Sequence, residues 1–242
     1  MRNIRIYQPG SYEVGQTIAL SAPAVQHVGL VLRLDVGDRI ILFRGDNHEY
    51  QAVLHSVQKK SIQVTIQTKS YVNRESPRRI HLAQGIAKGD KMEWIIQKAV
   101  ELGVASITPL ITDRTVVRLD VQRLEKKHQQ WQAIAIAACE QSGRNHIPTV
   151  HPVCSFADHL HRHQTSYQWL LSPDASSSWP SIPNNNAELA ILIGPEGGFS
   201  PEELHQAQTH QVQHIRLGPR ILRTETAALT ALSILQNLYG DL

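Results

Sequence analysis

A glycine-rich segment, Ile193-Gly-Pro-Glu-Gly-Gly-Phe-Ser-Pro-Glu-Glu203, has the residue types of a ligand-binding loop. It follows the apolar run 189–193, which predicts a strand covered on both faces. Ser200 suits the N-cap of a following helix, Pro201 its first position and Glu203 a capping box. Glycines let a ligand approach the backbone, and open α/β sheets bind ligands at the carboxyl ends of their strands. We therefore expect a ligand contact here. It is neither a dinucleotide fingerprint nor a Walker A motif, and a turn that binds nothing is the alternative.

A second segment, Ile215-Arg-Leu-Gly-Pro-Arg-Ile-Leu-Arg-Thr-Glu-Thr-Ala-Ala228, mixes apolar and charged residues in one loop. A short strand is expected to end at Leu217, where a Gly-Pro pair forces a turn. Ile221 and Leu222 are apolar in an otherwise polar loop, and Arg223 follows them. This combination suits a flat apolar ring with polar edges.

The helix after this loop is expected to take its cap from Thr224 or Thr226. Its apolar residues cover a wide face, which indicates burial, either within the chain or against another subunit. A buried C-terminal helix with an ordinary cap and no binding role is the alternative.

Two further segments place cations at helix ends. Lys88-Gly-Asp-Lys-Met-Glu-Trp94 opens a helix, and Ala138-Cys-Glu-Gln-Ser-Gly-Arg144 closes one. Lys91 and Arg144 are able to hold phosphates there. Solvated helix ends explain them equally well, so both interpretations stay open.

The elements that must position these segments differ between the two parts of the chain. The first 70 residues predict short strands at 39–43, 50–57 and 61–66, the last with clean alternation of apolar and polar residues. Several short strands at close spacing indicate a small barrel. Residues 70–79 hold a proline, several charges and no apolar run, which predicts a linker.

From residue 80 onward strands alternate with helices. Residues 92–100 repeat apolar side chains at helical spacing, with Asp90 as the expected N-cap and Gly103 as the stop. A second, longer helix is expected to end at Gly143. The alternation predicts a parallel α/β sheet. We place its strands at 80–83, 104–111, 169–172 and 189–193, with a loop at 173–186.

The composition is that of an ordinary globular chain, with 41% hydrophobic and 19% charged residues among 242. No apolar run is long enough to span a bilayer, and the N-terminus lacks the apolar stretch of a secretory signal. Cys139 and Cys154 cannot form a disulfide framework. We expect a soluble cytoplasmic protein with no membrane partner.

Charge is unevenly distributed along the chain. Residues 1–150 hold 20 Lys and Arg against 13 Asp and Glu, whereas residues 151–242 hold 4 against 8. A basic half is typical of proteins that bind a polyanion such as RNA. A solvated surface with uneven charge is the alternative.

A histidine-rich segment raises the question of a metal site. His159, His161 and His163 alternate and would share one face of a strand. Asp158 is the only nearby carboxylate and no cysteine pair helps, so zinc ligation is weakly supported. We expect a solvated polar surface here, and no metal.

Several motifs together resemble the RsmE family of RNA methyltransferases. GPEGGFSPEE and LGPRILRTETAALTAL carry most of the resemblance. KGDKMEWIIQKAVELGV, ITPLITDRTVV and ACEQSGR agree in order, and HVGLVLR (His27–Arg33) resembles the family's N-terminal part. The likeness covers essentially the whole chain. It implies methyl transfer from S-adenosylmethionine (SAM) to N3 of one specific uridine in 16S ribosomal RNA of the small subunit, with S-adenosylhomocysteine as the product.

The resemblance also implies a fold. An RNA-binding, PUA-like β-barrel at residues 1–72 precedes a SPOUT methyltransferase domain at 73–242. In that domain a parallel sheet with helices is tied in a trefoil knot over roughly residues 168–242. The family is a homodimer whose active sites are shared between subunits, and it uses no metal.

In such folds SAM binds bent in the knotted loops, with its adenine in an apolar slot. Carried over by motif, the implied cofactor-binding residues are Leu171, Ser172, Gly194, Pro195, Glu196, Gly197, Leu217, Gly218, Ile221, Leu222, Arg223 and Thr226. For RNA we expect phosphate contacts from basic residues of both domains. These are Arg2, Arg33, Lys88, Lys91, Arg114 and Arg144.

The chemistry expected of such an enzyme is set by uracil. N3 carries a proton, so the enzyme must align N3 with the methyl group and help the proton leave. Arg223 is expected to stabilise negative charge on a uracil oxygen as N3 ionises. Glu225, Glu196 or solvent takes the proton, and the choice stays open. Since N3 lies on the pairing edge, a paired uridine must first be flipped out.

Two other functions remain as alternatives. One is a methyltransferase of the same fold that acts on another RNA, such as tRNA, or on a ribose. The other is a non-catalytic ribosome-assembly protein that binds RNA through its barrel. The complete set of cofactor-loop motifs argues against the loss of catalysis.

Overall fold

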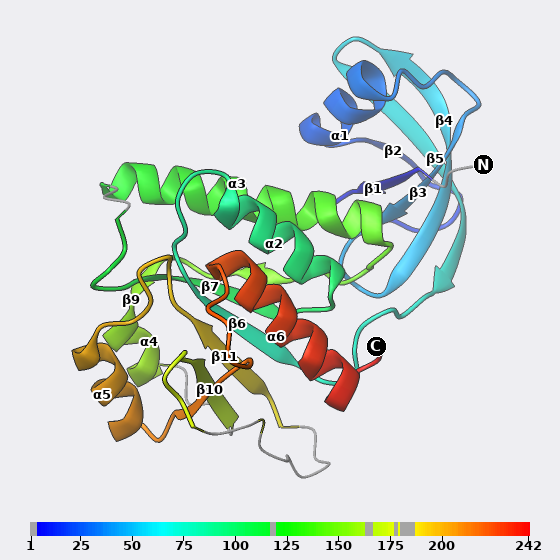
Figure 1. Cartoon of the computed structure of the whole chain (residues 1–242). Coiled ribbons are helices and arrows are strands. Elements are labelled where there is room, and N and C mark those ends of the chain that lie inside the picture. The colour runs from blue at the N-terminus through cyan, green and yellow to red at the C-terminus, as the bar shows by residue number, and fades with distance from the viewer. Residues whose placement is uncertain (1–3, 117–119, 163–166, 177–178, 180–186) are drawn as a thin grey trace. The chain divides into compact units, whose positions relative to one another are not determined.

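The computed structural model describes residues 4–116, 120–162, 167–176, 179 and 187–242. The chain divides into two compact units (Figure 1). The first comprises Met1–Glu75 and Cys139–Ile147, and the second comprises Ser76–Ala138 and Pro148–Leu242. The first unit thus takes in residues 139–147, which lie far along the chain from the rest of it. In the described part of the chain, no helix is both long and apolar enough to cross a membrane.

The first unit is built on one five-stranded sheet. Its order is β1 (Arg5–Tyr7), β3 (Arg39–Phe43), β4 (His48–Gln58), β5 (Ser61–Tyr71) and β2 (Thr17–Ala19). β1 runs parallel to β3, and the other neighbours are antiparallel. The three expected strands are confirmed, and β5 continues through the start of the expected linker. The sequence did not predict β1, β2, the short helix α1 (Ala22–Gln26) or the π-helix η1 (His27–Val31).

Alternation of side chains explains the core of this unit. Ile62, Val64 and Ile66 of β5 are buried on one face, while Gln63 between them is exposed. Tyr12 and Tyr50 pack edge to face within the same core, with ring centroids 4.7 Å apart. One face of the sheet is therefore buried in the core, and the alternate residues of the strand lie on the solvent-exposed face.

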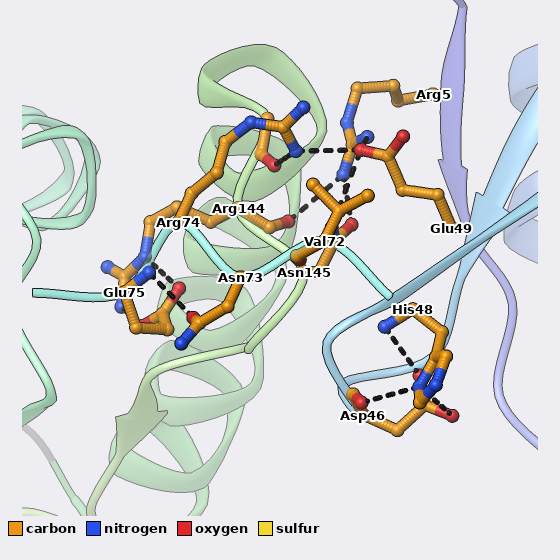
Figure 2. A network of polar contacts seen from close by, with 11 residues as sticks. Arg5, Asp46, His48, Glu49, Val72, Asn73, Arg74, Glu75, Arg144 and Asn145 are labelled. Atoms are coloured by element: carbon orange, nitrogen blue, oxygen red, sulfur yellow. Dashed lines mark hydrogen bonds and ion pairs between the residues drawn. The ribbon is translucent and has the colours of Figure 1, made fainter. Parts of the chain in front are cut away.

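Polar contacts attach residues 139–147 to the first unit (Figure 2). The Arg5 guanidinium donates to Glu49 Oε1 at 2.5 Å and to Asn145 Oδ1 at 2.6 Å. Arg74 donates to the same Glu49 oxygen at 2.7 Å. Burial alone would raise the pKa of Glu49, but these guanidinium contacts outweigh it and hold the pKa below its usual range. The network therefore depends on an ionised Glu49.

The second unit is built on a parallel sheet. Its order in the described residues is β12 (Gln213–Ile215), β10 (Tyr167–Leu171), β11 (Leu189–Ile193), β6 (Ile80–Gly85), β7 (Ser106–Ile111) and β8 (Thr149–Val150), and β9 (Cys154–Ser155) also pairs with β7. All of these pairs are parallel, which confirms the prediction. The loop expected at 173–186 lies partly outside the described residues.

Helices cover the sheet of the second unit on both faces. They are α2 (Lys91–Glu101), α3 (Val121–Ser142, which runs into the first unit), α4 (Phe156–Arg162), α5 (Pro201–Thr209) and α6 (Thr224–Tyr239). In Figure 1, α6 lies along β6 and β11 beside α2. Ala190 and Leu192 of β11 instead join the cluster that holds Phe156 of α4 and Ala207 of α5. Side chains alternate between the two faces of a strand, and helices cover both faces of β11, so every residue of β11 is buried.

One expectation about the histidines is wrong. Residues 156–162 form the helix α4, not a strand, and they bury Phe156, His159 and Leu160 at helical spacing. The His159 ring is stacked on that of His81, 5.6 Å away, instead of being solvated. His161 is exposed, as expected, and His163 lies outside the described residues. Among the residues described, no group of three His, Cys, Asp or Glu is placed to hold a metal ion.

Candidate active site

The glycine-rich loop leaves the carboxyl end of β11 and enters α5 through the expected capping box. Ser200 Oγ accepts from the Glu203 N–H at 3.1 Å, and the Glu203 carboxylate accepts from the Ser200 N–H at 2.9 Å. The loop after β7 is tied to the same cap. There the Asp113 N–H donates to Glu203 at 3.0 Å, and Ser200 Oγ donates to Asp113 at 2.6 Å. Two loops at one end of the sheet are thus held to one helix start.

The glycine-rich loop also packs closely against the end of β6. A Cβ added to Gly85 would lie 2.5 Å from Pro195 Cδ and 2.6 Å from Pro195 N. A side chain at Gly85 would therefore push the loop off the strand. Gly198, at φ +69°, makes the turn that brings the chain back toward Gly194.

The expectation that a threonine caps the start of α6 is wrong. Arg223 occupies the N-cap position, and its side chain makes no capping hydrogen bond. The Thr224 hydroxyl instead donates to the Gly194 carbonyl at 2.6 Å and accepts from Gln84 Nε2 at 2.9 Å. Thr226 is exposed. The sequence suggested a hydrogen bond within α6, but the Thr224 hydroxyl connects the start of α6 to the ends of β11 and β6.

These loops enclose a cavity of about 450 Å³ at the carboxyl ends of β10, β11 and β12. The expected cofactor-binding residues line it, with the exception of Thr226. They are Leu171, Ser172, Gly194, Pro195, Glu196, Gly197, Leu217, Gly218, Ile221, Leu222 and Arg223. Its volume falls in the range of small-molecule sites, about 300–1,000 Å³. The structure therefore gathers three segments into one pocket.

Sequence reasoning missed several residues of this cavity. Asp174, Phe199, Arg216 and Arg220 also line it. Arg216 and Arg220 lie within the quoted motif 215–228, so their charge on that loop was a usable signal. Asp174 stands in a polar loop with no recognisable pattern, and it could not have been picked out.

An ammonium group bridges two carboxylates beside the cavity. Lys91 Nζ lies 3.2 Å from Glu196 Oε1 and 3.6 Å from Glu225 Oε2. The Lys88 N–H donates to the same Glu196 oxygen at 3.1 Å. Burial would raise the pKa of Glu196, but backbone hydrogen bonds and Lys91 together hold that pKa below its usual range. Glu196 is therefore ionised at neutral pH, while Glu225 is absent from the cavity wall.

Arginines surround the mouth of the cavity. Arg114 donates to the Gly197 carbonyl at 2.8 Å and packs on the glycine-rich loop. Arg216, Arg220 and Arg223 are exposed. Within the described residues their side chains make no hydrogen bond or ion pair, so their charges face the cavity and solvent. Such a rim suits an anionic ligand next to the pocket.

The other residues expected to contact RNA are placed differently. Arg33 and Lys88 are exposed, whereas Arg2 lies outside the described residues. Lys91 is half-buried between its two carboxylates. Arg144 is buried, and its Nε donates to Glu75 at 3.0 Å (Figure 2). A carboxylate already holds the Arg144 guanidinium, and the phosphate contact expected there stays a prediction.

Comparisons with known proteins agree with this geometry. A family model described as an RNA methyltransferase domain matches residues 74–236, and one described as an RNA methyltransferase PUA domain matches residues 20–67. Ribosomal RNA small subunit methyltransferase E of Bacillus subtilis is 37% identical over 95% of this chain and 94% of its own length. That of Buchnera aphidicola subsp. Schizaphis graminum is 35% identical over 98% and 97%.

Solved structures extend the likeness to three dimensions. A Legionella pneumophila protein in complex with its cofactor SAM has a TM-score of 0.97 at 49% identity, over 100% of both chains. The SAM-bound small subunit methyltransferase E of Neisseria gonorrhoeae has a TM-score of 0.91 at 37% identity, over 99% of both. The α/β fold of the SPOUT methyltransferases, with an N-terminal PUA domain, is confirmed. The knot stays a prediction. Since a family model covers more than half of the chain and full-length relatives exceed 30% identity, the chain belongs to the family of ribosomal RNA small subunit methyltransferases E.

Proposed function

We propose that this protein transfers a methyl group from SAM to N3 of one specific uridine in 16S ribosomal RNA of the small subunit. The observation that carries the proposal is the cavity that the two motif loops build together, with its rim of exposed arginines. The SAM-bound relatives supply the cofactor by analogy, and the names of the relatives supply the small subunit. The choice of N3 rests on the family resemblance.

The residues present fit this cofactor. Gly194, Gly197 and Gly198 leave backbone groups open to the cavity, while Leu217 and Leu222 offer apolar surface for an adenine ring. Asp174 and Glu196 also line the cavity, and their negative charge complements a ligand that carries an amino group, hydroxyls and a cationic sulfur. When bound, SAM supplies a methyl group that is already activated on a sulfonium.

Arg223 is the residue we assign to the uracil. Its guanidinium is exposed, lines the cavity and has no hydrogen-bonding partner among the described residues. A cation beside a uracil oxygen stabilises the charge that develops as N3 loses its proton. Arg223 thus lowers the barrier without accepting the proton.

We assign the departing proton to water and not to a carboxylate. Glu196 has a lowered pKa and is already bonded to Lys88 N–H and Lys91, which makes it a poor base. Glu225 is held by Lys91 and is not part of the cavity wall. Glu196 is thus already engaged by other groups, and Glu225 lies off the cavity wall, so we assign the N3 proton to neither carboxylate.

The arginine rim is the expected meeting point with RNA. Arg114, Arg216 and Arg220 flank the pocket mouth, where the flanking phosphates of a flipped uridine would lie. Lys88 adds an exposed cation beside the pocket, where its N–H donates to Glu196, and Arg33 is an exposed cation of the first unit. A cytoplasmic homodimer whose subunits complete each other's sites is part of the proposal and rests on the resemblance alone.

Methylation of small subunits that lack this modification tests the proposal. The protein is incubated with methyl-labelled SAM and such subunits, and the RNA is digested to nucleosides. We expect labelled 3-methyluridine. A different labelled nucleoside would keep the enzyme class and overturn the N3 assignment. Cofactor binding without labelling of subunits or naked RNA would point to another substrate, and the absence of cofactor binding would favour the assembly-protein alternative.

A further inference from the structure

Lys91 occupies an unusual place for a lysine. It is the first residue of α2, where the free N–H groups of a helix carry partial positive charge and disfavour a cation. Its ammonium nevertheless points to two carboxylates, Glu196 and Glu225, at 3.2 and 3.6 Å. The stability of α2 does not explain a lysine at this position, whereas the two ion pairs do.

The two carboxylates come from the two motif loops of the pocket. Glu196 lies in the glycine-rich loop and lines the cavity, and Glu225 is in the first turn of α6, two residues after Arg223. Oε2 of Glu225 is buried and, within the described residues, has no hydrogen-bond donor. Lys91 is the cation that faces it. Without that cation, two carboxylates would face each other unscreened, one of them with a buried oxygen.

We propose that Lys91 is a positioning residue for the cofactor pocket. Its ammonium pairs with both Glu196 and Glu225, and so holds the glycine-rich loop next to the start of α6, where Arg223 lines the cavity. Lys91 itself is absent from the cavity lining, so it acts through these carboxylates. The inference rests on the proposed function, since the pocket is taken to hold SAM. It gives Lys91 a role other than the phosphate contact expected from the sequence.

Calorimetric titration of the full-length protein with SAM and with S-adenosylhomocysteine tests the role directly. K91M removes the charge and keeps much of the side-chain volume, while K91R keeps the charge. Lys98→Met is the matched control, because Lys98 lies on the same helix, is similarly exposed and pairs with Glu101 at 2.8 Å. We expect K91M to weaken binding about tenfold, and K91R and K98M to stay within about threefold of the wild type.

A double variant separates this role from general destabilisation. If Lys91 serves to offset Glu225, then E225Q in the K91M background removes the repulsion and restores most of the lost affinity. A purely structural role predicts that the two losses add. Thermal unfolding of each ligand-free variant checks that the compared proteins are folded.

The outcomes are distinguishable. K91M that binds SAM like the wild type, or losses that add in K91M/E225Q, would overturn the positioning role alone. Wild-type protein that binds neither SAM nor S-adenosylhomocysteine would overturn the proposed function and this inference with it. Weak SAM binding by folded K91M, with recovery in folded K91R and in the folded double variant, supports the role.

Discussion

The Thr224 hydroxyl donates a 2.6 Å hydrogen bond to the carbonyl oxygen of Gly194, and so fastens the start of α6 to the end of β11. The same hydroxyl accepts from Gln84 at the end of β6. One buried oxygen therefore connects three segments, and two of them, at Gly194 and Thr224, line the pocket.

Thr224→Val keeps the shape of this side chain and removes its hydroxyl. It leaves the Gly194 carbonyl and the Gln84 amide with one partner fewer in a buried place, so we expect a loss of about 1–3 kcal/mol in the free energy of unfolding. Urea denaturation measures it, and Thr224→Ser, which retains the hydroxyl, is the control. Equal stability of the valine variant and the wild type would show that the bond contributes nothing net.

Arg223→Ala tests the assignment to the uracil. We expect the turnover number to fall about 10²–10³-fold, because a charge-stabilising donor is lost at the developing oxyanion. The affinity for SAM should change little, since the glycine backbone and the apolar side chains remain. Single-turnover methylation and calorimetry measure the two effects, with Arg123→Ala on the exposed side of α3 as the control. Wild-type turnover by the variant contradicts the role.

Arg216→Ala and Arg220→Ala test the rim. Each change should weaken binding to small-subunit RNA and lower the slope of log affinity against log salt by about 1, as for one lost phosphate contact. Filter binding over a range of salt concentrations gives both values. Arg162→Ala, at an exposed position of α4, should leave the slope unchanged. An affinity that does not vary with salt even in the wild type would refute phosphate contacts altogether.

Glu49 gives a prediction about pH. Its pKa is lowered in the folded protein, because bonds from Arg74 and Arg5 outweigh the opposing effect of burial. The stabilisation is therefore present above the unfolded pKa of a glutamate and is lost as pH falls through the lower, folded value. Glu49→Gln should cost about 2 kcal/mol at pH 7, and the difference from the wild type should shrink in acid below about pH 4. Urea denaturation at both pH values decides, and a constant difference would exclude the ionised network.

Features determined by neighbouring residues could be predicted from the sequence. The strands at 39–43 and 189–193 have the predicted bounds, because a local apolar pattern suffices to define them. The capping box of Ser200 and Glu203 is equally local, since its partners stand three residues apart. The pocket itself could be predicted because both of its main loops carry recognisable motifs.

Features that depend on distant residues could not be predicted. Arg144 is buried against Glu75, which lies 69 residues away, and nothing near Arg144 in the sequence announces that partner. Thr224 has a residue type that favours a local cap, yet its bonds reach Gly194 and Gln84. His159 is buried because α4 turns it toward His81. In each case tertiary contacts overrule a local preference.

The first unit is assembled from two stretches of chain, and this sets an order of events during synthesis. Domains fold in general as they leave the ribosome, from the N-terminus onward. Here the Tyr7 N–H donates to Glu140 and the Arg5 guanidinium donates to Asn145. Both acceptors lie beyond residue 75, so the unit cannot be completed when only its first 75 residues have emerged. The ribosome must synthesise β6, β7 and all of α3 before Asn145 is available to the first unit. The first unit is therefore completed only after residues 76–138 of the second have been synthesised, and a fragment cut at residue 75 would lack part of its own fold.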